Sequence, residues 1–127
     1  MKRYLEPLFV KYYVNFVISG HLHAYSRSYP VANDQLDPKG PINIVLGNGG
    51  RQANAPFQNE IPEKWVAKRD HTTYGYGTIE FLSLRHAIYE WVQTGHNGPK
   101  DRGDNFLNVP ANMTEVVQIE NQYFLQH

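Results

Sequence analysis

The 127-residue sequence contains no cysteine, which excludes both a disulfide framework and a thiolate metal site. Charge of one sign is also missing, because twelve lysines and arginines balance twelve aspartates and glutamates without a run of either. This balance argues against a surface for nucleic acid or an anionic membrane. No apolar run approaches the roughly 20 residues of a membrane-spanning helix, and the N-terminus lacks the basic-then-apolar pattern of a signal peptide. With 41% hydrophobic residues, the chain has enough apolar material for one core.

Two histidines, one residue apart, follow directly on a short apolar run at 14–18. Segment 20–28 reads Gly-His-Leu-His-Ala-Tyr-Ser-Arg-Ser. In an extended strand, residues i and i+2 point to the same side, so His21 and His23 are predicted to face one site while Leu22 points into the core. Neutral imidazole is the commonest protein ligand for zinc and iron. The spacing alone leaves open that these are ordinary exposed histidines at a strand end.

The apolar pattern predicts one helix and several strands. A helix is expected over 4–12, with Pro7 in its first turn. The polar residues 51–73 predict a long surface excursion. Strands are expected at 14–18 and 42–46, and a hairpin at 78–84 and 87–94.

The chain is expected to divide into two parts. Residues 1–95 carry nearly all the predicted elements and form the folded part. Residues 96–127 are rich in Asn, Gln and Gly, and we expect a tail that covers an edge or is partly mobile.

The sequence around the histidine pair resembles the last metal-ligand motif of the purple acid phosphatases, which usually reads Gly-His-Val-His-Ala-Tyr-Glu-Arg-Ser. These enzymes are calcineurin-like metallophosphoesterases. The resemblance runs roughly from residue 4 to residue 94, with further matching segments at 40–50, 74–80 and 86–91. The family's earlier motifs, Asp-x-Gly, Gly-Asp-x-x-Tyr, Gly-Asn-His-Glu and a further His motif, are missing from their places before the histidine pair. We therefore expect the C-terminal part of a larger catalytic domain.

The resemblance implies an α/β fold, namely the C-terminal portion of a four-layer αββα metallophosphoesterase sandwich that is β-rich in this chain. It also implies hydrolysis of phosphate monoesters at acid pH by a dinuclear centre of Fe(III) with Fe(II), Zn(II) or Mn(II). In the family, the histidine at the position of His21 binds the divalent ion and the one at His23 binds the iron. The implied partners are the N-terminal half of the domain and a second copy in a homodimer, and the implied location is secreted, lysosomal or vacuolar. Ser26 replaces the family's glutamate, which puts the geometry of the following loop in question.

Other residues are weaker candidates. His71 and Arg27 could contact the substrate, but an ordinary loop histidine is the favoured interpretation of His71, and Arg27 is at least as well explained as a structural residue that packs against Tyr25. Asn112 begins an Asn-Met-Thr glycosylation sequon. No residue is assigned as the catalytic acid, base or nucleophile, and no organic cofactor site is indicated.

Two functions therefore remain open. The first is part of a purple-acid-phosphatase-like hydrolase in which this chain supplies two histidine ligands. The second is a non-catalytic metal-binding or interaction module, in which the pair holds one zinc or copper ion or none. In the first case the isolated chain should be inactive, and apolar side chains meant for the rest of the domain should be exposed.

Overall fold

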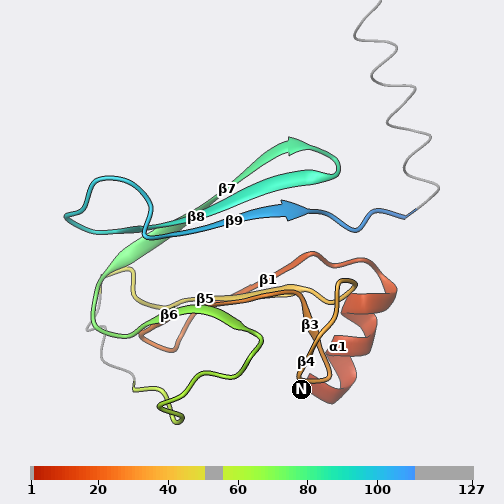
Figure 1. Cartoon of the computed structure of the whole chain (residues 1–127), viewed down its shortest axis with the longest axis horizontal. Helices are drawn as coiled ribbons and strands as arrows, with labels where there is room; N and C mark the ends of the chain where they lie inside the picture. The colour runs from red at the N-terminus through yellow and green to blue at the C-terminus, as the bar shows by residue number, and fades with distance from the viewer. Residues whose placement is uncertain (1, 51–55, 111–127) are drawn as a thin grey trace, which may run out of the picture.

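The described part of the chain consists mainly of two β-sheets stacked face to face, with a small two-stranded hairpin and a single helix at one end (Figure 1). The structure is a computed structural model, and it describes residues 2–50 and 56–110. The elements are α1 (Lys2–Lys11), β1 (Phe16–Ser19), β2 (Tyr25–Ser28), β3 (Val31–Ala32), β4 (Gln35–Leu36), β5 (Ile42–Leu46), β6 (Val66–Asp70), β7 (Gly75–Ser83), β8 (His86–Gln93) and β9 (Asp101–Phe106).

The first sheet has the strand order β1-β5-β2-β6, and only β1 and β5 run parallel in it. The second sheet is antiparallel, in the order β7-β8-β9. Strands β3 and β4 form a small hairpin whose turn residues, Asn33 and Asp34, both have positive φ (51° and 60°). A two-residue turn with positive φ at both positions matches the right-handed twist of the two strands that it joins. Asn and Asp adopt positive φ more readily than most residues.

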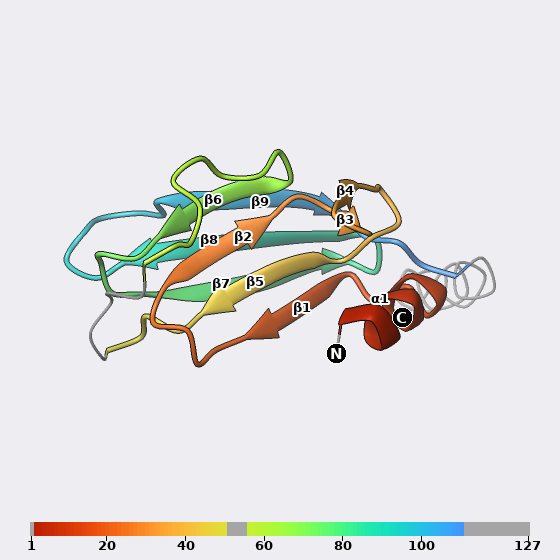
Figure 2. The ribbon, with the colours of Figure 1, turned by 90° about the horizontal axis from the view of Figure 1, so that it is seen from below.

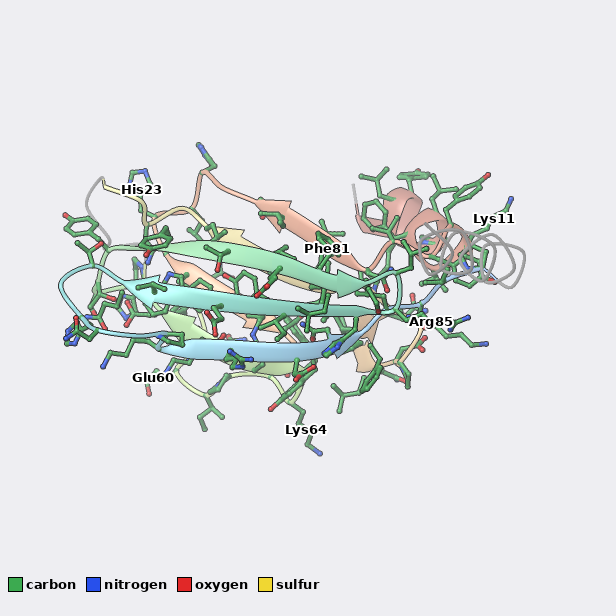
Figure 3. The ribbon with its side chains drawn as sticks, turned by 90° about the horizontal axis from the view of Figure 1, so that it is seen from above. Lys11, His23, Glu60, Lys64, Phe81 and Arg85 are labelled. Carbon is green, nitrogen blue, oxygen red and sulfur yellow. The ribbon has the colours of Figure 1, made fainter. Side chains whose placement is uncertain are left out.

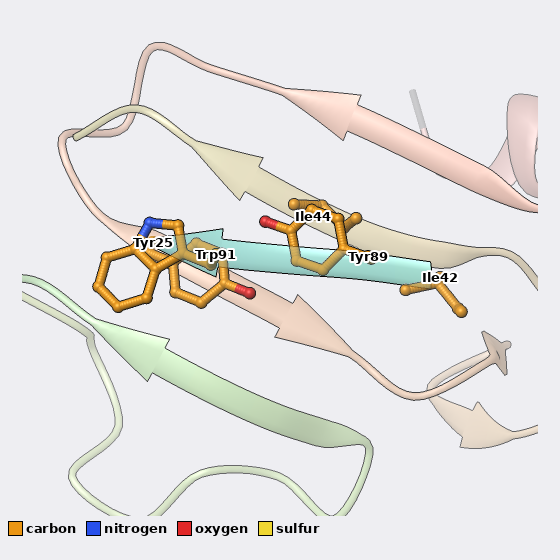
Figure 4. Packing of buried hydrophobic residues seen from close by; sticks show 5 residues of the cluster. All are labelled: Tyr25, Ile42, Ile44, Tyr89 and Trp91. Atoms are coloured by element: carbon orange, nitrogen blue, oxygen red, sulfur yellow. The ribbon is translucent and has the colours of Figure 1, made fainter. Parts of the chain in front are cut away.

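The core lies between the two sheets (Figure 4). Along β8, alternate residues are buried, as expected for a strand with one face on a core. The ring of Tyr25 stacks on that of Trp91, with centroids 4.3 Å apart and an interplanar angle of 2°. The cluster combines β2 and β5 of the first sheet with β8 of the second, and its buried members are Tyr25, Ile42, Ile44, Tyr89 and Trp91. Burial of these side chains is what joins the sheets.

Helix α1 begins at Lys2, so Pro7 lies inside it and not in its first turn as predicted. The helix closes with Tyr13 at φ 57° and a 2.9 Å hydrogen bond from the Val14 N–H to the Phe9 carbonyl. This left-handed residue with a six-to-one hydrogen bond is a common helix ending. Figure 2 shows α1 beyond one end of the sheets.

The predicted hairpin is confirmed as β7 and β8, and the strand at 42–46 is confirmed as β5. Five strands were not predicted: the central strand β2, the short β3 and β4, and the edge strands β6 and β9. Strand β6 lies within the segment interpreted as a surface excursion, and β9 lies within 96–127, where it pairs with β8. The sequon at Asn112 lies outside the described residues.

Apolar side chains are partly exposed, as expected for a piece of a larger domain. Ile18 is 53% exposed and Phe81 65%, whereas Ile44 is fully buried. A largely apolar groove of about 450 Å³ lies between α1 and the outer face of the first sheet, with Phe9 on one side and Val17 and Val45 on the other. Within residues 2–50 and 56–110, no helix has the length and apolar character needed to span a membrane.

Candidate functional site

The histidine pair lies at the end of the molecule opposite the helix, where His23 and Lys11 mark the two ends in Figure 3. Strand β1 ends at Ser19, and its parallel partner β5 ends at Leu46. The carboxyl ends of parallel strands therefore meet at this edge, which is where α/β sheets commonly carry their sites.

Residues 20–24 form a tight bend and not a continuation of the strand. The Leu22 N–H donates to the Gly20 carbonyl at 2.9 Å, and the Ala24 N–H donates to the Leu22 carbonyl at 2.7 Å. His21 has a φ of 71°, in the left-handed region that non-glycine residues seldom occupy. The prediction that Leu22 is buried is wrong: it is 44% exposed, because strand alternation no longer applies after Ser19.

The loop after β5 packs directly against this bend. The Gly47 N–H donates to the Ala24 carbonyl at 3.0 Å. A Cβ at Gly47 would lie 1.6 Å from the Leu22 carbonyl oxygen, so only glycine fits this close approach.

Asn48 links the same loop to a third one. Its side chain is buried, and its Nδ2 donates to the Thr73 carbonyl at 2.9 Å. Its backbone carbonyl accepts from the Gly75 N–H at 3.1 Å. The loops 20–24, 47–50 and 70–74 therefore meet at one end of the sheets, and we call them the three-loop end.

His71 belongs to this three-loop end. It follows Asp70, which pairs with Tyr25 in the ladder between β6 and β2. Its ring packs edge-on against Phe57, with centroids 5.3 Å apart. The Asp70 carboxylate accepts from the Thr73 N–H at 2.9 Å and the Thr73 hydroxyl at 2.8 Å. Burial opposes ionisation of Asp70, but the hydrogen bond from the Thr72 N–H, together with those from Thr73, outweighs it and lowers the pKa of Asp70.

Arg27 is not directed at solvent. Its Nε and Nη2 donate to the two carboxylate oxygens of Asp101 on β9, at 2.7 and 2.9 Å, and the guanidinium is largely buried. The Tyr25 hydroxyl donates to the same carboxylate at 2.6 Å. These contacts favour the structural alternative for Arg27 over a role in substrate binding.

The comparisons with known proteins agree with one another. A family model described as "Iron/zinc purple acid phosphatase-like protein C" matches residues 40–102. "Purple acid phosphatase 18" of Arabidopsis thaliana is 30% identical over 109 residues, which cover 85% of this chain and 25% of the relative. The "Phosphoenolpyruvate phosphatase" of Allium cepa is 30% identical over 136 residues, which cover 98% and 26%. The purple acid phosphatase of Lupinus luteus seeds superposes with a TM-score of 0.68 at 23% identity, over 76% of this chain and 18% of that one.

The chain is related to the purple acid phosphatases. It spans about a quarter of the length of the curated relatives it matches. Its two sheets correspond to the strand-rich C-terminal part of the purple acid phosphatase fold.

The purple acid phosphatase family implies a dinuclear metal centre, and the donor set tests whether this chain fits one. Two imidazoles at a sheet edge fit as part of such a centre. Within residues 2–50 and 56–110, however, no three His, Cys, Asp or Glu side chains come together as a metal site. Hard trivalent iron needs anionic oxygen ligands, so the described residues fit a contribution to the centre and not the whole of it.

Sequence reasoning missed Asn48 and Asp101. The segment 47–50 follows the predicted strand at 42–46, and its Asn48 links this loop to the one before β7 through Thr73 and Gly75. Asp101 is identified only by its hydrogen bonds with Arg27, which lies 74 residues earlier in the chain. No local pattern indicates either contact.

We predict that the stability of the fold falls in acid partly through Asp101. Burial alone would raise the pKa of Asp101, but hydrogen bonds donated by Arg27 and Tyr25 outweigh it and lower that pKa below its ordinary 3.8. A lowered folded-state pKa contributes stability that is complete above the ordinary value and is lost as pH falls through the folded value. Urea midpoints between pH 6 and pH 2 should therefore converge for the wild type and Asp101→Asn as pH falls. If the plots of urea midpoint against pH for the two proteins stay parallel, protonation of Asp101 does not contribute to the loss of stability in acid.

Proposed function

We propose that this chain is part of a purple-acid-phosphatase-like hydrolase of phosphate monoesters, in which His21 and His23 each bind one metal of the dinuclear centre. The observation that carries the proposal is the bend that bears both histidines at the carboxyl end of β1. Gly47 packs against that bend and His21 has a left-handed backbone. Such a conformation has an energetic cost and is often found at functional sites.

The proposed centre pairs Fe(III) with Fe(II), Zn(II) or Mn(II), with His21 on the divalent ion and His23 on the iron. When bound, such a centre would supply Lewis-acid chemistry toward a phosphoryl oxygen and a bound water. The chain's own contribution is to present two imidazole nitrogens from one rigid bend. His71 lies at the same three-loop end and is the remaining candidate for a hydrogen bond to the substrate.

The wider proposal follows the family resemblance. The remaining ligands would come from an N-terminal half of the catalytic domain, and two copies would form a homodimer. The protein would be secreted, lysosomal or vacuolar, with glycosylation at Asn112.

A second function is favoured by one observation, the lack of a third ligand near the histidines among the described residues. A lone pair of imidazoles suits a single zinc or copper ion held by a non-catalytic module. This alternative predicts metal binding without any role in phosphate chemistry.

Zinc titration of the 127-residue chain tests the assignment of the ligands. In the isolated chain, without the ligands that the rest of the domain would supply, we expect the two imidazoles to share one zinc ion. His21→Ala and His23→Ala should each lower the zinc affinity at least about tenfold, since even partners beyond the ligands cost that much. His96→Ala tests whether another histidine at this end binds the zinc instead, because it lies in the connection between β8 and β9, where the Thr94 N–H donates to the Tyr74 carbonyl. Zinc binding that survives both substitutions, or is lost with His96→Ala alone, would contradict the assignment.

A further inference from the structure

A carboxylate from the second sheet holds the strand that follows the histidines. Tyr25 and Arg27 are the second and fourth residues after His23, and both donate hydrogen bonds to Asp101 on β9. The pair of bonds from Arg27 is bidentate, a geometry that fixes orientation as well as distance. The start of β2 is therefore attached to a strand more than 70 residues away.

This cluster is well shielded from water. The side chains of Arg27 and Asp101 are only 10% and 9% exposed, and Tyr25 is fully buried against Trp91. The Arg27 Nη2 also donates to the Arg102 carbonyl at 3.3 Å. Charge-assisted hydrogen bonds are stronger in such an environment, and a buried charge without its partner is costly.

The cluster lies next to the bend that bears the histidines. Ala24, which joins His23 to Tyr25, is fully buried, and its carbonyl accepts from the Gly47 N–H. The loop after β5 contacts the bend through Gly47. On the other side, Asp101 of β9 binds Tyr25 and Arg27, the residues that follow the bend. Two attachments leave the backbone of His23 little freedom to shift.

We propose that Asp101 is a positioning residue, which sets the place of His23 through its hydrogen bonds to Tyr25 and Arg27. This inference rests on the proposed metal-ligand role of His23. Asp101 itself contacts neither metal nor substrate in this account. Its effect is to preorganise a ligand, as residues beyond the ligands commonly do in metal sites.

The test compares Asp101→Asn with two matched controls. Asp104→Asn makes the same change on the same strand, but at an exposed side chain paired with His86. Ile79→Ala removes packing from the core that contains Tyr25, but it leaves the hydrogen bonds of Tyr25 and Arg27 to Asp101 in place. Zinc affinity is measured for each at a temperature where melting curves show it fully folded, and the amide and imidazole signals of His23 are followed by NMR without metal.

We expect Asp101→Asn to weaken zinc binding about tenfold, at the lower end of such effects, because it acts through two intermediates. Asp101→Asn should also shift and broaden the NMR signals of His23. Ile79→Ala should lower the melting temperature about as much as Asp101→Asn does, but it should change neither the zinc affinity nor the His23 signals. Asp104→Asn should change nothing. If zinc affinity and the His23 signals of Asp101→Asn match those of Ile79→Ala, Asp101 is only a stabilising residue and the proposal fails. A wild-type chain that binds no zinc, with His23 signals that still respond to Asp101→Asn, would count against the metal-ligand role and not against the positioning.

Discussion

Replacing Arg27 with leucine is expected to lower the free energy of unfolding by about 3–5 kcal/mol, the usual cost of removing one partner of a buried ion pair. The substitution leaves the Asp101 carboxylate buried with only the Tyr25 hydroxyl as a side-chain donor. The hydrogen bond from Tyr25 cannot balance a full charge in that environment. Urea unfolding at pH 6, where Asp101 is ionised, measures the loss.

The chain supplies a matched control in Arg102, the next residue on β9. Arg102 pairs with Glu90, but the two side chains are 51% and 29% exposed, so Arg102→Leu should cost less than about 1 kcal/mol. A double variant, Arg27→Leu with Asp101→Leu, should recover part of the loss, because it no longer buries a lone charge. Equal losses of unfolding free energy for Arg27→Leu and Arg102→Leu would show that the buried ion pair stabilises the fold no more than the exposed one.

Local patterns were enough to predict the hairpin. Strands β7 and β8 are adjacent in sequence, and both are rich in β-branched and aromatic residues. The buried residues Ala87, Tyr89 and Trp91 alternate along β8, which is the period that a half-buried strand requires. Neither strand depends on a distant partner for its pattern to be recognisable.

Two of the strands that were missed, β6 and β9, lie at the free edges of the sheets. Strand β6 reads Val-Ala-Lys-Arg-Asp and β9 reads Asp-Arg-Gly-Asp-Asn-Phe, and each has a paired neighbour on one side only. Charged residues on edge strands discourage pairing with other chains, so such strands are often polar. From the sequence alone, both segments were interpreted as loops, because they lack an apolar pattern and form strands only by pairing with β2 and β8.

The candidate site residues could be named from the sequence, but the geometry around them could not be predicted. The histidine pair could be recognised from its motif, but the strand rule was extended past Ser19 and gave the wrong environment for Leu22. The positive φ of His21 and the contact of Gly47 with the Leu22 carbonyl depend on how two loops meet. Such contacts are set by the packing of β1 beside β5 and leave no trace in a local pattern.

The largest expected effect on activity is a complete absence of turnover by this chain alone. Within residues 2–50 and 56–110, no third His, Cys, Asp or Glu joins His21 and His23, and two neutral imidazoles leave the charge of a dinuclear iron centre uncompensated. We therefore expect the purified 127-residue chain, supplied with iron and zinc at pH 5, to hydrolyse an aryl phosphate no faster than the metals in buffer. The onion phosphatase that it resembles, assayed under the same conditions, is the positive control. Hydrolysis above background that disappears in a His21→Ala, His23→Ala double variant would overturn the prediction, because the chain would then hold a working metal site without ligands from any other part of the domain.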